Sequence, residues 1–467
     1  MFKNWKQTVR DVALVIGITV AGGCDSAQDK SKPTNLLFVV MDTTRADHLG
    51  CYGYDVRDTT PTVDALALEG LVLANTYSHS SLTPVSAGSF LSGTLPYRHG
   101  VRSLFMVGKE SLSGEIPSLF GLLGSDGRAT AGFVSAKPMG KQYGLNRGFD
   151  LYQDDLSATK ERFEIKRFGD APQRPGDETT DLALAWLAQN SARPFALMVH
   201  LFDAHDSSFL PPEKFLEEHL SFPFTRGLGR NPDHFPLDSV EQMLELYDAE
   251  IRFTDMQLER LIAKLEELGV RHETLIVVLA DHGESFGEHG YFTHGWLSDE
   301  QLRVPLVLQG PGIAPGSRIE SRVRTVDLLP TLAELFGVAT PDGIDGVSVM
   351  SLVGQDDDPL EREVYAEVHH APGDPRGREP QLYTLISGPW KYIHHPESQG
   401  HELYDLVVDP LESRNLFGEK SDLAMRLLGQ LVKRGALGGG GVSLEGLSEE
   451  YIRNLQSLGY LGDVKRE

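Results

Sequence analysis

The chain has 467 residues, of which 40% are hydrophobic and 24% are charged, as in ordinary soluble globular proteins. Its formal net charge of −24 argues against nucleic acid or an anionic membrane surface as a partner of the bulk surface. An anionic substrate would therefore need local positive charge from a metal, a basic side chain or a helix end. Only two cysteines are present, Cys24 and Cys51, so no framework of disulfides can form.

Residues 1–24 have the pattern of an export signal, with a basic start and an apolar stretch too short for a good membrane span. Small residues precede Cys24, as in a bacterial lipobox. We predict cleavage before Cys24, a lipidated N-terminus and a location in the bacterial cell envelope, at the periplasm or the cell surface. Residues 25–34 are predicted to be a polar tether. Plain secretion and an uncleaved anchor are the alternatives.

Residues 35–350 alternate short apolar runs with helical patterns. Such alternation predicts an α/β fold in which helices cover both faces of a mostly parallel sheet. The polar segments 155–180 and 206–238 are predicted to be long loops, and loops of that length are usually functional. Strands are predicted near residues 35–41, 72–77, 129–134, 195–201, 275–280 and 304–309, and helices near 61–69, 84–92, 178–189, 239–268 and 327–336.

The composition changes near residue 355, where an acidic break is followed by short strand-like runs. Residues 355–435 are therefore predicted to be a small C-terminal α+β region that ends in a helix near 420–434. The glycine run at 438–441 and the amphipathic tail predict a linker and a short terminal helix over residues 436–467.

Two buried strand patterns run directly into polar residues. Residues 36–41 lead into Asp42, and residues 275–280 lead into Asp281 and His282. The carboxyl ends of parallel strands lie at one edge of a sheet, where ligand-binding groups collect. Two carboxylates and an imidazole suit Zn²⁺ or Mn²⁺, and a mostly oxygen shell also admits Ca²⁺ or Mg²⁺. We expect one divalent metal ion at this edge, with Thr83 beside it.

Thr83 precedes Pro84 at the start of the helical pattern 84–92. Threonine is a common helix N-cap, and proline is favoured at the first helical position. A hydroxyl among unpaired N–H groups at the positive end of a helix could receive an anionic ester. The alternative is a capped helix without a further role.

These stretches belong to an ordered series of motifs. The series resembles the sulfatase family of the alkaline phosphatase superfamily over roughly residues 35 to 420. Each motif alone is unspecific, and the specificity lies in their order. The resemblance implies an alkaline-phosphatase-like fold and a metal-dependent ester hydrolase. The motifs lie at residues 40–53, 83–93, 97–100, 144–150, 200–205, 280–284, 303–307, 326–331, 402–406 and 409–410.

The chain departs from the family at the nucleophile. Most sulfatases use a formylglycine made from Cys or Ser in a Cys/Ser-x-Pro-x-Arg motif. Counted back from Gly93, the first position of that motif is Thr83 and the Arg position is Ala87. Sulfatases also usually carry two adjacent Asp ligands, where this chain has Asp42-Thr43. The resemblance then implies a plain threonine nucleophile, as in one-metal phosphotransferases and phosphodiesterases of the superfamily.

Five further residues are candidates for a role in the site, and the resemblance supplies the roles of His205, His294 and Lys137. His205 matches a histidine that contacts the transferring group or protonates the leaving group, and His294 stands where sulfatases have a lysine. Lys137 could bind the anion, and Arg45 could pair with the ester or with an aspartate. A structural role is the alternative for each of the four. His289 could bind a metal or cap its loop, and the cap is the preferred interpretation.

Three functions remain open from the sequence. The first is hydrolysis of a sulfuric ester by an exported, metal-dependent member of the sulfatase family that uses Thr83 as nucleophile. The second is hydrolysis or transfer of a phosphate monoester or diester by the same residues, which includes a transferase that acts on a lipid head group. The third is a non-catalytic surface protein that binds an anion. The expected substrate is a small or a glycan- or lipid-linked anionic ester, with membrane contact only through a lipid on Cys24.

Overall fold

The computed structural model describes residues 32–104, 111–157, 173–205, 211–223, 239–355, 358, 360–370, 378–435 and 437. The predicted export signal, nearly all of the tether, and the C-terminal linker and helix lie outside the described residues. Lipidation of Cys24 and the envelope location therefore stay predictions. Within the described part, no helix is both long and apolar enough to cross a bilayer.

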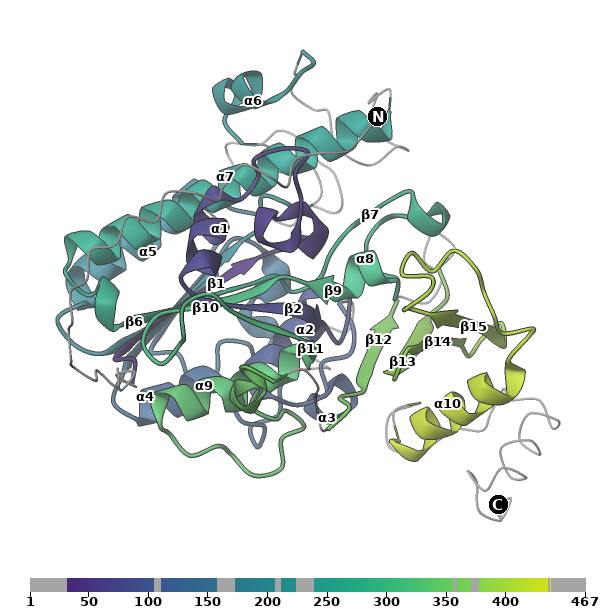
Figure 1. Ribbon diagram of the computed structural model, residues 1–467. Coiled ribbons are helices and arrows are strands. Elements are labelled where there is room, and N and C mark those ends of the chain that lie inside the picture. Colours follow the sequence, from purple (N-terminus) through teal and green to yellow (C-terminus); the bar gives the residue numbers. More distant parts are fainter. Residues whose placement is uncertain are drawn as a thin grey trace, which may run out of the picture.

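A sheet of nine strands forms the centre of the larger body (Figure 1). Its order is β11-β2-β10-β6-β1-β5-β3-β4, with β9 paired to β2, and only β9 and β10 run antiparallel to their neighbours. The predicted mostly parallel sheet is confirmed. The strands are β1 (Asn35–Met41), β2 (Leu71–Tyr77), β3 (Ala129–Val134), β4 (Leu151–Gln153), β5 (Phe195–Leu201), β6 (Thr274–Leu279), β9 (Arg303–Val304), β10 (Leu306–Gln309) and β11 (Ser317–Arg324).

Successive side chains of each central strand point to opposite faces of the sheet, and both sets are apolar. Helices therefore cover both faces. In β1, Phe38 and Val40 contribute to the core under α2 (Thr83–Ser92), α4 (Leu119–Ser125) and α9 (Leu328–Phe336). Leu37 and Val39 contribute to the opposite core, under α1 (Pro61–Leu68), α5 (Gly176–Asn190) and α7 (Val240–Glu267). The apolar side of α7 is buried there, as its period predicts.

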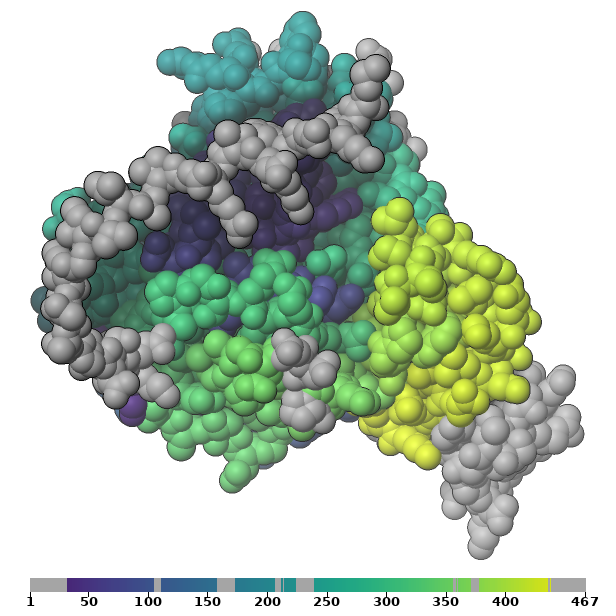
Figure 2. All heavy atoms as spheres, viewed as in Figure 1, coloured from purple at the N-terminus to yellow at the C-terminus, as the bar shows by residue number. Residues whose placement is uncertain are grey.

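A second, four-stranded antiparallel sheet lies at the C-terminal end of the described chain. It consists of β12 (Val364–His369), β13 (Gln381–Ser387), β14 (Trp390–His395) and β15 (Gly400–Asp405), in that order. Helix α10 (Ser421–Lys433) packs on it. Figure 2 shows this C-terminal part, in yellow, against one side of the larger body.

The remaining elements of the described residues are short. The helices are α3 (Pro96–His99), α6 (Glu213–His219) and α8 (Asp299–Leu302), and the strands are β7 (Ser285–Phe286) and β8 (Phe292–Thr293). The 3-10 helices are η1 (Ala46–His48), η2 (Gly50–Tyr52), η3 (Lys137–Met139), η4 (Lys141–Tyr143), η6 (Arg271–Glu273), η7 (Glu288–Gly290), η8 (Thr325–Asp327) and η9 (Met350–Leu352).

Three predicted segments differ from the structure. The strand predicted at 304–309 is divided at Pro305 into β9 and β10, because proline has no N–H for the ladder. The predicted loops contain helix: α5 begins at Gly176, and α6 lies within 206–238. Helix α6 buries Leu216 against Leu246 of α7, a contact that the polar composition around it conceals.

Candidate active site

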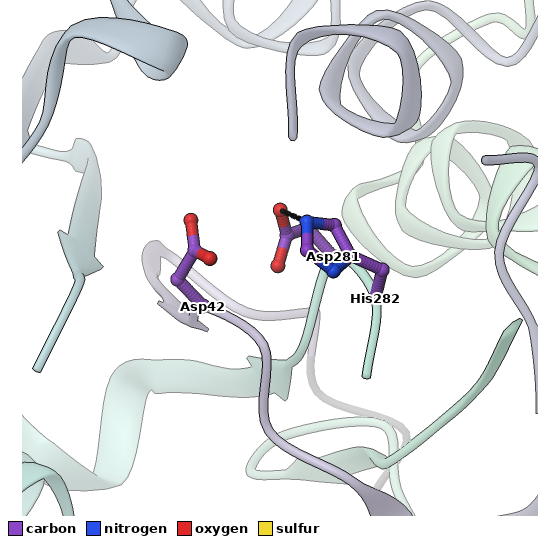
Figure 3. A group of neighbouring side chains, drawn as sticks. All are labelled: Asp42, Asp281 and His282. Carbon is purple, nitrogen blue, oxygen red and sulfur yellow. Dashed lines mark ion pairs between the residues drawn. The ribbon is translucent and has the colours of Figure 1, made fainter. Parts of the chain in front are cut away.

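The carboxyl ends of β1 and β6 lie side by side because these strands pair in parallel, with Val40 opposite Leu279. Asp42 follows β1, and Asp281 and His282 follow β6. All three side chains are completely buried, and one ligand atom of each lies within 4.8 Å of the others. Figure 3 shows the two carboxylates directed toward the same space, with the imidazole beside Asp281. We call these three residues the Asp42 cluster.

Buried oxygens of the Asp42 cluster lack partners. Asp42 Oδ1 and Asp281 Oδ2 receive no hydrogen bond, and among the described residues no lysine or arginine pairs with either carboxylate. Asp281 Oδ1 accepts one hydrogen bond, from the backbone N–H of Thr43 at 3.2 Å. Burial, and then the charge of Asp281, raise the pKa of Asp42 well above its ordinary value. Orphaned oxygens of this kind fit a divalent cation, which would replace the missing positive charge.

His282 is oriented as a metal ligand. Its Nδ1 lies 2.9 Å from the carbonyl oxygen of Gly283, and a carbonyl can only accept, so Nδ1 carries a proton. With its proton on Nδ1, the ring can offer the lone pair of Nε2 to a metal ion, and Nε2 lies 3.3 Å from Asp281 Oδ2. Histidines that bind metals commonly donate their other N–H to a backbone carbonyl in this way.

His200, at the end of β5, is a site residue that the sequence analysis did not single out. Its Nε2 donates to Asp42 Oδ2 at 2.7 Å, and burial lowers the pKa of His200 to about 4, so the ring is neutral at pH 7. His200 lies inside the motif 200–205 and opposite Val40 of β1. The signal for it was its position at the end of a strand that neighbours β1.

Thr83 does not cap its helix. Helix α2 begins at Thr83 itself, and the backbone N–H groups of Val85 and Ser86 bond to the carbonyl of Leu82, which is the N-cap residue. The predicted N-cap is therefore displaced by one residue. The hydroxyl is free to face the Asp42 cluster, where Oγ1 lies 3.5 Å from Asp42 Oδ2 and 3.3 Å from His282 Nε2.

The first turn of α2 is fixed from two directions. Ser86 Oγ donates to the backbone oxygen of Asp281 at 2.7 Å, which ties the helix to the end of β6. Leu82 and Val85 belong to an apolar cluster with Val364 and Val368 of the C-terminal sheet. The smaller sheet thus helps to hold Thr83 against the Asp42 cluster.

His205 and His294 lie together beside the Asp42 cluster. Their Nε2 atoms are 3.0 Å apart, and the rings of His294 and His282 lie 4.5 Å apart between centroids. His294 Nδ1 donates to the carbonyl oxygen of Ser81 at 2.8 Å. Burial, and then the neighbouring histidines, lower the pKa of His294 well below its usual range, so the ring is neutral and its Nε2 accepts. The shared proton therefore belongs to His205 Nε2.

Arg45 and Lys137 are occupied elsewhere. Arg45 forms ion pairs of 2.7 Å with both Asp47 and Glu288, the structural alternative considered for it. Lys137 Nζ donates to the backbone oxygen of Asp154 at 3.3 Å. Neither side chain hydrogen-bonds to Thr83 or to the Asp42 cluster in the described part of the chain.

Two family models match the chain. The sulfatase model matches residues 34–338, and the model of the C-terminal region of N-sulphoglucosamine sulphohydrolase matches residues 287–434. The chain belongs to the sulfatase family. It is therefore a member of a family of hydrolases of sulfate esters, which typically bind a divalent metal ion.

Individual sulfatases align with most of the chain. An ulvan-active sulfatase of Formosa agariphila is 26% identical over 441 residues, which cover 88% of this chain and 83% of the relative. A Delta 4,5-hexuronate-2-O-sulfatase of Bacteroides thetaiotaomicron is 25% identical and covers 86% of this chain and 87% of its own length.

Solved structures confirm the fold. A protein in complex with its substrate D-glucosamine-2-N,6-O-disulfate superposes with a TM-score of 0.70 at 21% identity, covering 87% of this chain and 97% of the other. A phosphonate monoester hydrolase of Agrobacterium radiobacter gives a TM-score of 0.68 at 20% identity, covering 87% and 95%. The alkaline-phosphatase-like fold expected from the sequence is thereby confirmed.

Proposed function

We propose that this sulfatase-family protein is a metal-dependent hydrolase of sulfuric esters that uses Thr83 as its nucleophile. The observation that carries the proposal is the position of Thr83 Oγ1, which lies within 3.5 Å of both Asp42 Oδ2 and His282 Nε2. A hydroxyl so close to a buried pair of carboxylates is placed for activation by a cation. The substrate would approach from the side of His205 and His294.

The Asp42 cluster and Thr83 would hold one divalent ion, and Ca²⁺, Mn²⁺ and Zn²⁺ all accept such donors. When bound, the ion would lower the pKa of the hydroxyl and neutralise charge on the transferring group. His200 would keep Asp42 Oδ2 in position through its N–H.

The chain's own residues account for both halves of the reaction. Thr83 Oγ1 loses its proton and attacks sulfur, a sulfothreonine ester forms, and the bond from sulfur to the alcohol oxygen breaks. The proton that Thr83 loses would end on the departing oxygen, which leaves as an alcohol, and His205 Nε2 is the ring atom proposed to relay it, so that the ring is unchanged after the step. Water then attacks the same sulfur, releases sulfate and restores the hydroxyl.

The substrate class that we propose is a sulfated saccharide. Support comes from the relatives, whose names specify ulvan and hexuronate 2-O-sulfate, and from the structural neighbour that binds a glucosamine disulfate. Export and attachment through Cys24, proposed from residues 1–24 alone, would place the site where extracellular glycans are processed.

A second candidate is hydrolysis of a phosphate or phosphonate ester. Unmodified threonine favours it, because sulfatases benefit from the hydrate of formylglycine when sulfate is eliminated. Phosphonate monoester hydrolases are also among the structural neighbours. A non-catalytic anion-binding role is disfavoured, because the carboxylates, the imidazole and the hydroxyl are all in place.

A paired assay tests the proposal. The metal-loaded protein is given an aryl sulfate, an aryl phosphate monoester and an aryl phosphodiester, with Thr83→Ala as the test variant and Thr83→Ser as the matched control. We expect Thr83→Ala to lower kcat on the sulfate by about 10³-fold or more even when excess metal keeps the site loaded, while Thr83→Ser retains measurable turnover.

The other outcomes are also decisive. Thr83-dependent turnover of a phosphoester alone would select the second candidate. Full sulfate turnover by Thr83→Ala would overturn the nucleophile. Metal binding without turnover of any of the three esters would favour the anion-binding role.

A further inference from the structure

A second group of possible metal ligands lies outside the candidate active site. His289 is on η7, Glu300 is on α8, and Glu412 is on the turn that follows β15. One ligand atom of each lies within 4.8 Å of the others. We call these residues the His289 cluster. It joins the larger body, which supplies His289 and Glu300, to the C-terminal part of the chain, which supplies Glu412.

Glu300 is held with one oxygen directed into the cluster. Its Oε1 accepts hydrogen bonds from Ser285 Oγ at 2.7 Å and from Ser298 Oγ at 2.5 Å. Its Oε2 receives no hydrogen bond from the described residues, and His289 Nε2 lies 3.8 Å from it. The side chain is only 9% exposed. A buried carboxylate oriented by hydroxyls on one oxygen, with the other oxygen open, is typical of a metal ligand.

Glu412 is buried with an excess of negative charge. Its Oε2 accepts from the backbone N–H of Asp299 at 2.9 Å, and its Oε1 pairs with Lys391 Nζ at 2.5 Å. Lys391 also pairs with Asp299 at 3.2 Å. The Lys391 ammonium group therefore pairs with two carboxylates, those of Asp299 and Glu412, while Glu300 has no lysine or arginine partner among the described residues. A divalent cation would supply positive charge to Glu300.

The backbone holds His289 in an unusual conformation. Its φ is 55°, in the left-handed region that few residues other than glycine adopt, and it lies between Gly287 at 108° and Gly290 at 78°. A cavity of about 760 Å³ adjoins the cluster and is lined by all three of its residues. The imidazole is partly exposed to this cavity, so an ion from solvent can reach it.

We propose that the His289 cluster is a second divalent cation site, suited to Zn²⁺, which His289, Glu300 and Glu412 would bind together with water. One imidazole and two carboxylates are ordinary zinc ligands, and a fourth position taken by water completes a tetrahedron. The site is independent of the proposed esterase activity.

Such an ion would connect two parts of the molecule. Gln301, next to Glu300, accepts a hydrogen bond at its backbone oxygen from Gly283 N at 2.8 Å, and Gly283 follows the candidate metal ligand His282. The ion would thus fix the turn at Glu412 to the segment that carries part of the Asp42 cluster. We assign it a structural role, because no residue of the His289 cluster contacts Thr83.

Zinc stoichiometry tests the proposal. The full-length protein is stripped with a chelator and dialysed against Zn²⁺, and bound zinc per chain is measured by mass spectrometry. The variants are His289→Ala, Glu300→Gln and Asp281→Asn, each alone, and the first two also combined with Asp281→Asn. His272→Ala is the matched control, because His272 is an exposed histidine that lies only beside Glu273.

We expect His289→Ala to bind one zinc fewer than the wild type, Glu300→Gln to weaken that site by about 10- to 100-fold, and His272→Ala to change nothing. If Asp281→Asn alone leaves the stoichiometry unchanged while His289→Ala lowers it, the second site stands and the proposed catalytic site fails. If neither His289→Ala nor Glu300→Gln alters zinc binding, the His289 cluster is not a cation site.

Discussion

The Asp42 cluster and the His289 cluster balance their charge differently. The Asp42 cluster lies at the carboxyl edge of a parallel sheet, and among the described residues no lysine or arginine pairs with its carboxylates. The His289 cluster is made of residues from the larger body and from the C-terminal part of the chain, and a buried ammonium group, that of Lys391, pairs with its Glu412. Carboxylates of the first kind can be neutralised only by protons or by an added cation. Those of the second kind are already partly neutralised by the protein.

Without Lys391, the His289 cluster would resemble the Asp42 cluster, in which no lysine or arginine of the described residues pairs with the carboxylates. Lys391→Met leaves the buried Glu412 and the partly buried Asp299 without their cation, so we expect the free energy of unfolding in chelator to fall by about 3–5 kcal/mol. Excess Zn²⁺ should recover part of this loss. Urea denaturation measures both effects, and Lys214→Met is the control because that lysine is 86% exposed. A loss under about 1 kcal/mol would show that Lys391 does not neutralise the cluster.

A smaller effect is expected from substitution of His200. It tests whether the orientation of the Asp42 carboxylate, and not only its charge, contributes to metal affinity. His200→Leu removes the N–H that reaches Asp42 Oδ2, so metal affinity should fall by about 10- to 100-fold. His200→Gln keeps a donor and should recover part of the affinity. Calorimetric titration with Mn²⁺ measures it, and equal affinities for the wild type and the Leu variant would remove the positioning role.

The free energy of unfolding of the metal-free protein should depend on pH, because ionised carboxylates without a cation destabilise the Asp42 cluster. The folded protein holds the proton of Asp42 more tightly than the unfolded chain does, because its pKa is raised from 3.8. This proton therefore stabilises the metal-free protein fully below the ordinary pKa of 3.8, and the stabilisation is lost as the pH rises through the raised pKa of the folded protein.

Asp42→Asn, which cannot ionise at this position, should lose less stability in chelator as the pH rises from about 5 to 8. Saturating metal should reduce the difference for the wild type. Urea denaturation at several pH values gives both slopes. Parallel slopes for the wild type and the variant in chelator would contradict the account of Asp42.

Most of the fold could be predicted because buried parallel strands have a simple pattern. The predicted runs 35–41 and 129–134 coincide with β1 and β3. Strand β11 was not predicted, since only Ile319 and Val323 of its eight residues are buried and charged residues alternate with them at the edge of the sheet. Such an edge strand is decided by its pairing with β2, which the local sequence does not reveal.

Site residues could be predicted from the sequence where they follow the ends of neighbouring strands. They could not be predicted where their role depends on contacts between side chains. Asp42, Asp281 and His282 meet because β1 and β6 are neighbours. The role of His200 depends on the register of β5 against β1, and Arg45 is committed to Asp47 and Glu288 by contacts that no local pattern displays. Cavities and charge balance, as at Glu412, require the packed structure.

The place of β1 in the sheet also determines when the site can be assembled. β1 lies between β5 and β6, and 238 residues separate Thr43 from its partner Asp281. At a synthesis rate of ~5–20 residues per second, the first carboxylate waits on the order of tens of seconds for the second. A nascent chain that ends before β6 therefore carries Asp42 and Thr83 with one side of β1 unpaired. The residues of the candidate cation site are therefore complete only after more than half of the chain has been synthesised.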